Sequence, residues 1–232
     1  MKKFYKSVDV EAADDGHIIT LDGRLVKTPG RATLVLPTRA VADAVAAEWD
    51  AQEDIIKPDE MHQTRLANTA LDRVALRHEA VTAEVAAFAG TDLLCYRADE
   101  PAELASQQCA LWDPYLAWAA QRYRAPLATT SGIMPVQQEA AVLDRYSAAV
   151  RGYDAFELTA LHALTGGLGS LVLALAYMEG YSSLDAVWRA SILDATYQET
   201  EWGTDWEVEE KREKLRNELL AAAEFISHLR NK

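Results

Sequence analysis

The chain has 232 residues, 50% of them hydrophobic and 25% charged, which is typical of a globular protein with one large or two small domains. Its 23 Lys and Arg against 36 Asp and Glu give a formal net charge of -13, so the average surface repels phosphate backbones and anionic lipid headgroups. We therefore expect neither nucleic acid nor a membrane as a partner. Two cysteines are too few for a disulfide framework, and we expect Cys95 and Cys109 to be small core residues in a reducing compartment.

The first part of the chain, from Phe4 to Pro37, alternates apolar and polar residues with a period of two. Asp22-Gly23 stands between two apolar runs and predicts a type I′ hairpin turn, because that turn needs positive φ at both central residues. These features predict a small antiparallel sheet. Thr38 then offers a capping hydroxyl to a helix that we expect over residues 39–52.

Nearly everything after Pro58 has helical spacing, including a long helix expected over residues 101–123. The apolar run from Leu168 to Met178 is about half as long as a membrane-spanning helix and predicts a buried helix. Strands that precede helices favour the α+β class. We expect a small N-terminal antiparallel β domain with one helix, residues 1–58, followed by a larger all-helical domain, residues 59–232.

The clearest enzyme-like feature is the glycine-rich stretch from Gly166 to Ser170, since such loops at helix N-termini bind phosphates. It lacks the Lys of a Walker loop and follows an expected helix rather than a strand, which favours close helix packing or a helix restart. The five histidines have no metal-ligand spacing, and Cys95 lies in an apolar segment that favours a structural role. We predict no catalytic residue, metal or cofactor.

A helix expected over residues 184–206, starting at Ser182-Ser183, has two distinct faces. The face predicted to be buried comprises Trp188, Ile192, Ala195, Trp202 and Trp206. The opposite, exposed stripe comprises Ser191, Asp194, Gln198, Glu201 and Asp205. This stripe is either a solvated helix face or a binding surface. Glu199 falls within the apolar face, so either it pairs with a buried Arg or the helix turns to expose it.

Residues 191–203 resemble a motif of the Atp12 family: serine, any residue, leucine, an acid, two residues, an aromatic, glutamine, three residues and Trp-Gly. Further family-like stretches occur in the same order along the chain, over a region of about residues 4–206. They are Leu21–Arg24 with Thr28-Pro29, Glu48–Gln52, Met61–Asp72, Asp92–Arg97 and Trp112–Pro114.

The resemblance implies a chaperone without catalytic activity that binds the unassembled F1-ATPase alpha subunit during assembly of ATP synthase. The residues that it assigns to partner binding are Ser191, Asp194, Gln198, Glu201, Trp202 and Gly203. Those that it assigns to structural or functional roles are Glu48, Trp49, Asn68 and Asp72. Asp194 takes an acidic position that is usually Glu in the family, and the segment after Gly203 departs from the mitochondrial members.

Two alternatives remain at this level: a small-molecule enzyme with a pocket between the β and helical parts, and a general acidic scaffold with many clients. Trp49 is expected as a buried, domain-bridging core residue rather than a direct partner contact. With neither a signal peptide nor a presequence at Met1, we expect a bacterial, cytoplasmic protein. We also expect a monomer, and the lack of a phosphate-binding loop with its Lys predicts that it binds no nucleotide.

Overall fold

The computed structural model describes residues 1–132, 134–203 and 205–231, without the side chain of Trp202. They form two compact units. The first contains Met1–His78, Asp154–Ala160 and the chain from Leu220, and the second contains Glu79–Tyr153 and Leu161–Leu219. Residue 58, where the sequence predicts a domain boundary, falls inside the first unit, so a division at that residue stays a prediction.

The first unit is built on a small antiparallel sheet, as predicted. Its strands are β1 (Val8–Ala13), β2 (Gly16–Leu21), β3 (Arg24–Leu25) and β4 (Val35–Leu36). Strand β2 is central, since it pairs with all three others. Asp22 and Gly23 adopt φ values of 50° and 75°, which are the positive angles of the expected hairpin turn between β2 and β3.

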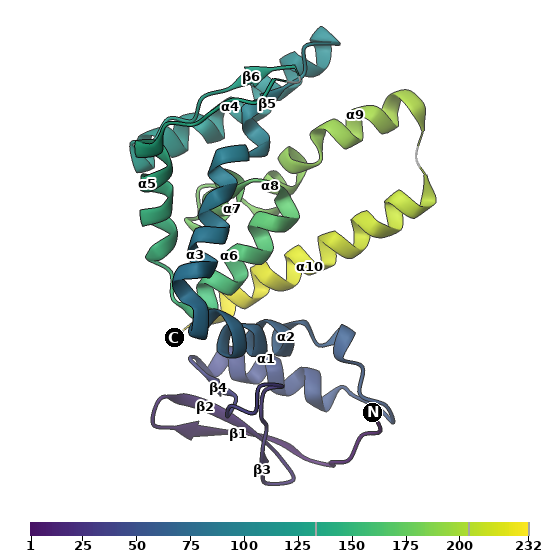
Figure 1. Ribbon diagram of the computed structural model, residues 1–232. Helices are drawn as coiled ribbons and strands as arrows, with labels where there is room; N and C mark the ends of the chain where they lie inside the picture. Colours follow the sequence, from purple (N-terminus) through teal and green to yellow (C-terminus); the bar gives the residue numbers. More distant parts are fainter. Residues whose placement is uncertain (133, 204, 232) are drawn as a thin grey trace. The chain divides into compact units, whose positions relative to one another are not determined.

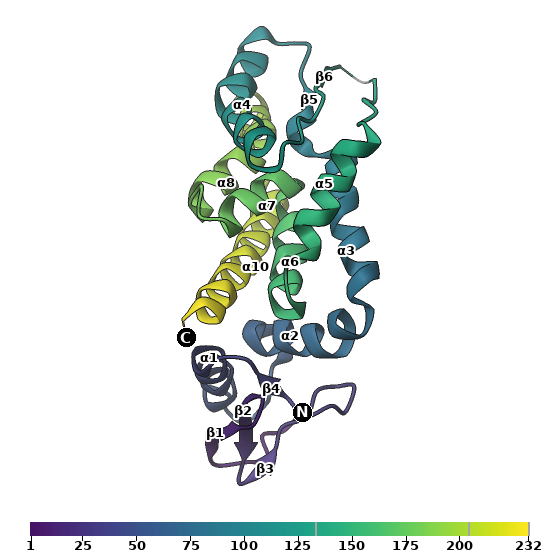
Figure 2. The same ribbon diagram turned by 90° about the vertical axis from the view of Figure 1, so that its left-hand side faces the viewer.

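Two helices of the first unit lie on the same side of this sheet (Figures 1 and 2). They are α1 (Arg39–Asp50) and α2 (His62–Thr69), with the short 3₁₀ turn η1 (Pro58–Glu60) before α2. Helix α1 begins at the predicted cap, where the Thr38 hydroxyl accepts a hydrogen bond from the Val41 amide. After α2 the chain continues as a π-helical turn, η2 (Ala70–Val74), and a 3₁₀ turn, η3 (Ala75–Arg77).

The second unit is mostly helical. Its elements are α3 (His78–Ala87), η4 (Phe88–Thr91), η5 (Leu93–Cys95), α4 (Ala102–Tyr123), α5 (Ala140–Arg151), α7 (Leu171–Met178), α8 (Leu184–Ser191) and α9 (Leu193–Trp202). Helices α6 (Ala155–Leu168) and α10 (Trp206–Arg230) contribute residues to both units. The long helix predicted over 101–123 is confirmed as α4. The prediction of an all-helical C-terminal part missed a short parallel pair, β5 (Tyr96–Arg97) and β6 (Thr130–Ser131).

Helix α7 lies at the centre of the second unit and packs against α4 and α8 (Figure 2). Every residue of α7 except Tyr177 is buried, which confirms the buried helix predicted from the apolar run. Among the residues that the structure describes, no helix combines the length and the hydrophobicity needed to cross a bilayer.

The glycine-rich stretch ends one helix and restarts the next, as predicted. Gly169, with φ of +65°, follows the end of α6, and the Ser170 hydroxyl accepts a hydrogen bond from the Leu173 amide at the start of α7. A Cβ on Gly167 would lie 2.7 Å from the Leu219 side chain, so this glycine also permits close packing.

A buried carboxylate completes the start of α7. Asp92 is fully buried and accepts hydrogen bonds from the Ser170 hydroxyl (2.7 Å) and from the Val172 amide (3.0 Å). It therefore occupies amides at a helix N-terminus that in a phosphate-binding loop would face the ligand. Of the two cysteines, Cys95 is buried as expected, whereas Cys109 is exposed because it lies on the outer face of α4.

The Asp92 carboxyl makes stability depend on pH. Burial raises its pKa from 3.8 to about 6, while its hydrogen bonds lower it in part. Between these values the unfolded chain loses a proton that the folded chain keeps, so the free energy of unfolding falls as pH rises. Two pKa units correspond to at most about 3 kcal/mol.

We predict that Asp92→Asn removes this pH-dependent contribution to stability. The free energy of unfolding of the variant should therefore decline less than the parent's between pH 4 and pH 6.5. Urea denaturation across that pH range measures the difference, and Asp144→Asn, an exposed position on α5, provides the matched control. Equal pH profiles for the parent and Asp92→Asn would contradict the prediction.

Candidate functional site

The residues singled out in the sequence fall into two groups, one in each unit. Glu48, Trp49, Asn68 and Asp72 all belong to the first unit, and residues 191–203 belong to the second. Three residues of the first group line a pocket that Glu48 adjoins, and the second group lies along α8 and α9 up to Gly203.

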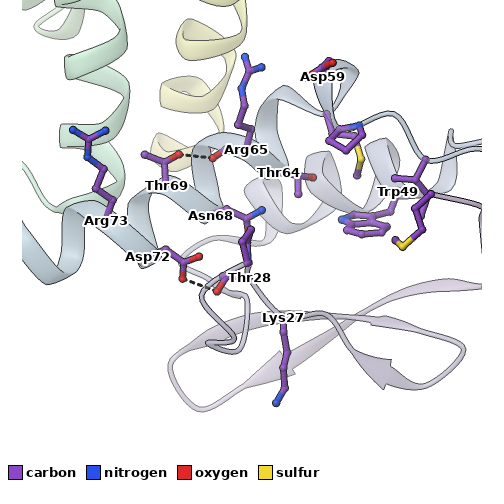
Figure 3. Close-up of a pocket in the computed structure, with 15 residues that line it drawn as sticks. Lys27, Thr28, Trp49, Asp59, Thr64, Arg65, Asn68, Thr69, Asp72 and Arg73 are labelled. Carbon is purple, nitrogen blue, oxygen red and sulfur yellow. Dashed lines mark hydrogen bonds between the residues drawn. The ribbon is translucent and has the colours of Figure 1, made fainter.

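The pocket has a volume of about 610 Å³ and lies wholly within the first unit (Figure 3). Its lining includes Thr28 from the loop after β3, Trp49 from α1, Ile56 and Met61 from the connection to α2, and Asn68 from α2 itself. The walls thus come from residues on both sides of position 58, where the sequence suggested a cleft between β and helical parts. The volume is in the usual range for ligand pockets.

Glu48 does not line the pocket, but it holds in place helix α2, which forms one of its walls. Helix α2 has no capping side chain of its own, because Met61 precedes it. Instead, Glu48 on α1 accepts hydrogen bonds from the Gln63 amide (2.7 Å), the Thr64 amide (2.8 Å) and the Thr64 hydroxyl (2.7 Å). A carboxylate is favourable at a helix N-terminus, so this one side chain fixes α2 against α1.

Asp72 fastens the other end of the same wall to the loop after β3. Its carboxylate accepts hydrogen bonds from the Thr28 hydroxyl (2.6 Å) and the Gly30 amide (2.7 Å), the first of which is drawn in Figure 3. A Cβ on Gly30 would meet this carboxylate at 2.6 Å, so only glycine permits the approach. Asp72 lies in the π-helical turn η2, a distortion frequent at functional sites.

Trp49 and Asn68 line the pocket, and each also has a buried polar atom without a hydrogen-bond partner. Both side chains are half-buried, and the Trp49 Nε1 and Asn68 Oδ1 atoms are buried without a hydrogen bond. Trp49 was expected in the core, but its indole instead lines the pocket and contacts the Tyr5 ring edge-on, at 5.8 Å between centroids. An unsatisfied buried polar atom costs about 1–3 kcal/mol, so each of these two atoms lowers the stability of the first unit.

The second group lies on two helices rather than the single one predicted for residues 184–206. Helix α8 begins at the predicted Ser183 cap and ends at Ser191, and α9 ends before Gly203, which has φ of +87°. A new helix, α10, then starts at Trp206, whose side chain is 70% exposed and not on a buried face. The prediction of a continuous amphipathic helix was wrong, because the chain breaks at Ile192 and at Gly203.

The predicted polar stripe is accessible to different extents. Gln198, Glu201 and Gly203 are exposed, whereas Ser191 and Asp194 are half-buried. The Ser191 hydroxyl donates a hydrogen bond to the Trp188 carbonyl within α8 (2.8 Å). The predictions for the Trp202 side chain lie outside what the structure describes.

Asp194 is held by Gln108, which was not predicted from the sequence to belong to the site. The Gln108 Nε2 atom donates a hydrogen bond to Asp194 Oδ1 (2.8 Å), and Gln108 Oε1 accepts one from the Ala98 amide (2.8 Å). Gln108 is 1% exposed and follows Leu104 by four residues on the buried face of α4. An amide on an apolar helix face was the signal that was missed, since a buried polar group needs a partner.

Glu199 resolves the choice that the sequence left open. It is half-buried and forms a bidentate ion pair with Arg212 of α10, whose Nη1 lies 2.6 Å from Glu199 Oε2. This pair lowers the pKa of the Glu199 carboxyl. Helix α9 and the first half of α10, which run out and back in Figure 1, are therefore joined by a charged contact.

Catalytic chemistry has little support in the residues that the structure describes. Within them, no group of His, Cys, Asp and Glu is arranged to hold a metal ion. Burial raises the pKa of the Cys95 thiol to about 12, so this cysteine remains protonated and is a poor nucleophile, as expected.

Because Asp194 is half-buried and bonded, its replacement should affect stability more than an exposed position would. We predict that Asp194→Lys leaves the Gln108 amide without its acceptor and costs about 1–3 kcal/mol, at about 2–4 °C of melting temperature per kcal/mol. Glu201→Lys makes the same charge change at an exposed position of α9 and should melt like the parent. Thermal denaturation of both variants checks this, and equal melting temperatures would contradict it.

The sequence and the structure of this chain are similar to known proteins of the same family. The family model for the ATP12 chaperone protein matches residues 2–120. The mitochondrial protein atp12 of Schizosaccharomyces pombe is 22% identical, with 96% of this chain and 81% of that protein covered. The crystal structure of Atp12 from Paracoccus denitrificans is 39% identical, with a TM-score of 0.94 over 99% of this chain and 98% of that one.

A mutant of the Paracoccus protein superimposes equally well, with the same TM-score of 0.94. A protein of Agrobacterium tumefaciens is 36% identical, with a TM-score of 0.94 over 99% of this chain and 86% of that one. Since the family model matches about half of the chain and the solved structures match nearly all of it, the chain belongs to the ATP12 family of ATP synthase assembly chaperones, which are not enzymes.

Proposed function

We propose that this assembly chaperone binds the unassembled alpha subunit of F1-ATPase in the bacterial cytoplasm, as a monomer. An unassembled subunit of a ring exposes apolar interface that would otherwise aggregate, and a holding protein covers it until the proper neighbour arrives. The partner-binding residues of the proposal are those of α8 and α9: Ser191, Asp194, Gln198, Glu201, Trp202 and Gly203.

The observation that carries this proposal is the way Asp194 is presented. A fully buried amide from α4 holds one carboxylate oxygen, while the side chain stays half-exposed next to Gln198 and Glu201, which are exposed on the same helix. A solvated helix face needs no such support. A fixed carboxylate beside exposed polar groups suits the recognition of a cationic or amide-rich surface on a partner.

The sequence left two alternatives to this proposal, a small-molecule enzyme and a general acidic scaffold. A small-molecule enzyme is set aside by family membership. A general acidic scaffold would hold other subunits as well as alpha, so selectivity between the alpha and beta subunits of F1 separates it from the proposal.

We predict that the protein keeps separately refolded alpha subunit soluble at equimolar ratio and forms a complex with it, but not with the beta subunit. Light scattering and size-exclusion chromatography measure the two effects. Glu201→Lys should fold normally and weaken the alpha complex by about tenfold or more, since it replaces attraction with repulsion at a contact. Equal protection of beta would favour the scaffold, and full activity of Glu201→Lys would assign α9 to a solvated face.

A further prediction is that the protein does not bind ATP or GTP with micromolar affinity. The glycine-rich stretch has no Lys, and Asp92 already accepts the bond from the Val172 amide at the start of α7 and would repel a phosphate. Titration calorimetry with each nucleotide checks this. Micromolar binding of either nucleotide would contradict the prediction.

A further inference from the structure

Helix α10 begins with an exposed tryptophan that takes no part in the core. Trp206 is 70% exposed, more than any other tryptophan whose side chain the structure describes. The inner face of the helix follows steps of three and four residues, through Val208, Arg212, Leu215 and the buried Leu219. Trp206 precedes Val208 by two residues and therefore lies on the opposite, outer face.

Two carboxylates share this outer face with the indole. Glu210 and Glu213 follow Trp206 by four and seven residues, and both are exposed. Helical side chains lean toward the N-terminus of their helix, so the Glu210 carboxylate leans toward the indole. None of the ion pairs between described residues involves Glu210 or Glu213. Trp206, Glu210 and Glu213 together form the α10 patch.

Elsewhere the protein itself fills a similar arrangement with an arginine. The Arg97 guanidinium lies over the Trp112 ring, 5.1 Å from its centroid, and Arg97 Nη2 is 2.7 Å from Asp113 Oδ1. An indole face and a carboxylate thus bind one guanidinium together. The α10 patch has the indole and the carboxylates, but no Lys or Arg of the described chain lies over the Trp206 ring.

The charge around the α10 patch also favours a cation. Between Arg189 and Lys211 the chain has seven acidic residues and no Lys or Arg. One of the seven, Asp205, offsets the partial positive charge of the helix start by accepting a hydrogen bond from the Glu207 amide (3.0 Å). A side chain that approaches Trp206 therefore meets a negative potential.

We propose that the α10 patch binds an arginine side chain of the partner protein, which stacks on the Trp206 indole and pairs with Glu210. Arginine suits the site better than lysine, because its planar guanidinium stacks on an indole and pairs with a carboxylate at the same time. The contact extends the proposed partner-binding surface beyond Gly203 along the chain. Only the identity of the partner, the F1 alpha subunit, rests on the proposed function.

The first test needs no client. The full chain is labelled with 5-fluorotryptophan, and the ¹⁹F signal of Trp206 is identified by its loss in Trp206→Phe. At constant ionic strength, acetyl-arginine-amide should shift this signal more than acetyl-citrulline-amide, which has a similar shape without the charge. An equal response to the two probes would overturn the proposal.

The contribution of the carboxylates is tested with the same probe. The double variant Glu210→Gln/Glu213→Gln should reduce the shift of the Trp206 signal, because it removes the charges that pair with the guanidinium. The matched control is Asp14→Asn/Asp15→Asn, which removes the same charge from an exposed pair in the first unit and should leave the shift unchanged. Equal shifts in the two double variants would overturn the pairing with Glu210.

The second test measures the complex with the alpha subunit. Trp206→Leu keeps an apolar side chain but lacks the aromatic face, so it should weaken the complex by about fivefold or more while melting like the parent. Trp206→Phe should have an intermediate affinity, since phenylalanine attracts cations less than tryptophan does. A Trp206→Leu complex as tight as the parent's would overturn the proposal. If the parent does not bind the alpha subunit, the client assignment fails, and the response to acetyl-arginine-amide still decides whether the α10 patch is an arginine site.

Discussion

Amides at the start of a buried helix must find acceptors inside the protein, and twice in this fold a carboxylate from a distant segment supplies them. Glu48 binds the first amides of α2, and Asp92 binds those of α7. Each bond fixes a helix to a neighbouring segment. The pocket wall depends on the first of these contacts, and the central helix of the second unit depends on the other.

The two contacts differ in what they leave beside the capped helix. At α7 the Val172 amide is bonded to Asp92, so it is not available to a phosphate. At α2 the Glu48 contact fixes one wall of a pocket, whose lining includes Trp49 and Asn68.

Features set by neighbouring residues were predictable from the sequence. The turn at Asp22-Gly23 and the caps at Thr38 and Ser183 each depend on a few consecutive residues, and all three were confirmed. Contacts over long sequence separations were not predictable. Nothing beside Glu48 indicates that it caps a helix fifteen residues later, although the absence of a capping residue before His62 is visible in the sequence.

The same limit explains the errors at α9. Helical periodicity continues through Ile192 and Gly203, so the pattern alone cannot show that the chain breaks there. The resemblance identified Asp194, but its partner Gln108 is 86 residues away and became visible only when α4 and α9 were placed together. The sequence suggested a pocket between the β and helical parts, whereas the pocket found lies wholly within the first unit, and its lining was not predicted.

The π-helical turn at Ala70–Val74 accommodates one residue more than an α-helix would over the same span. Each residue of an α-helix rotates the chain by about 100°. Deleting a single residue here would restore regular winding and swing the Asp72 carboxylate away from Thr28 and Gly30. Among homologues, a one-residue gap at this turn would therefore mark proteins that have lost the hydrogen bonds between this turn and the loop after β3, even where the Asp itself is retained.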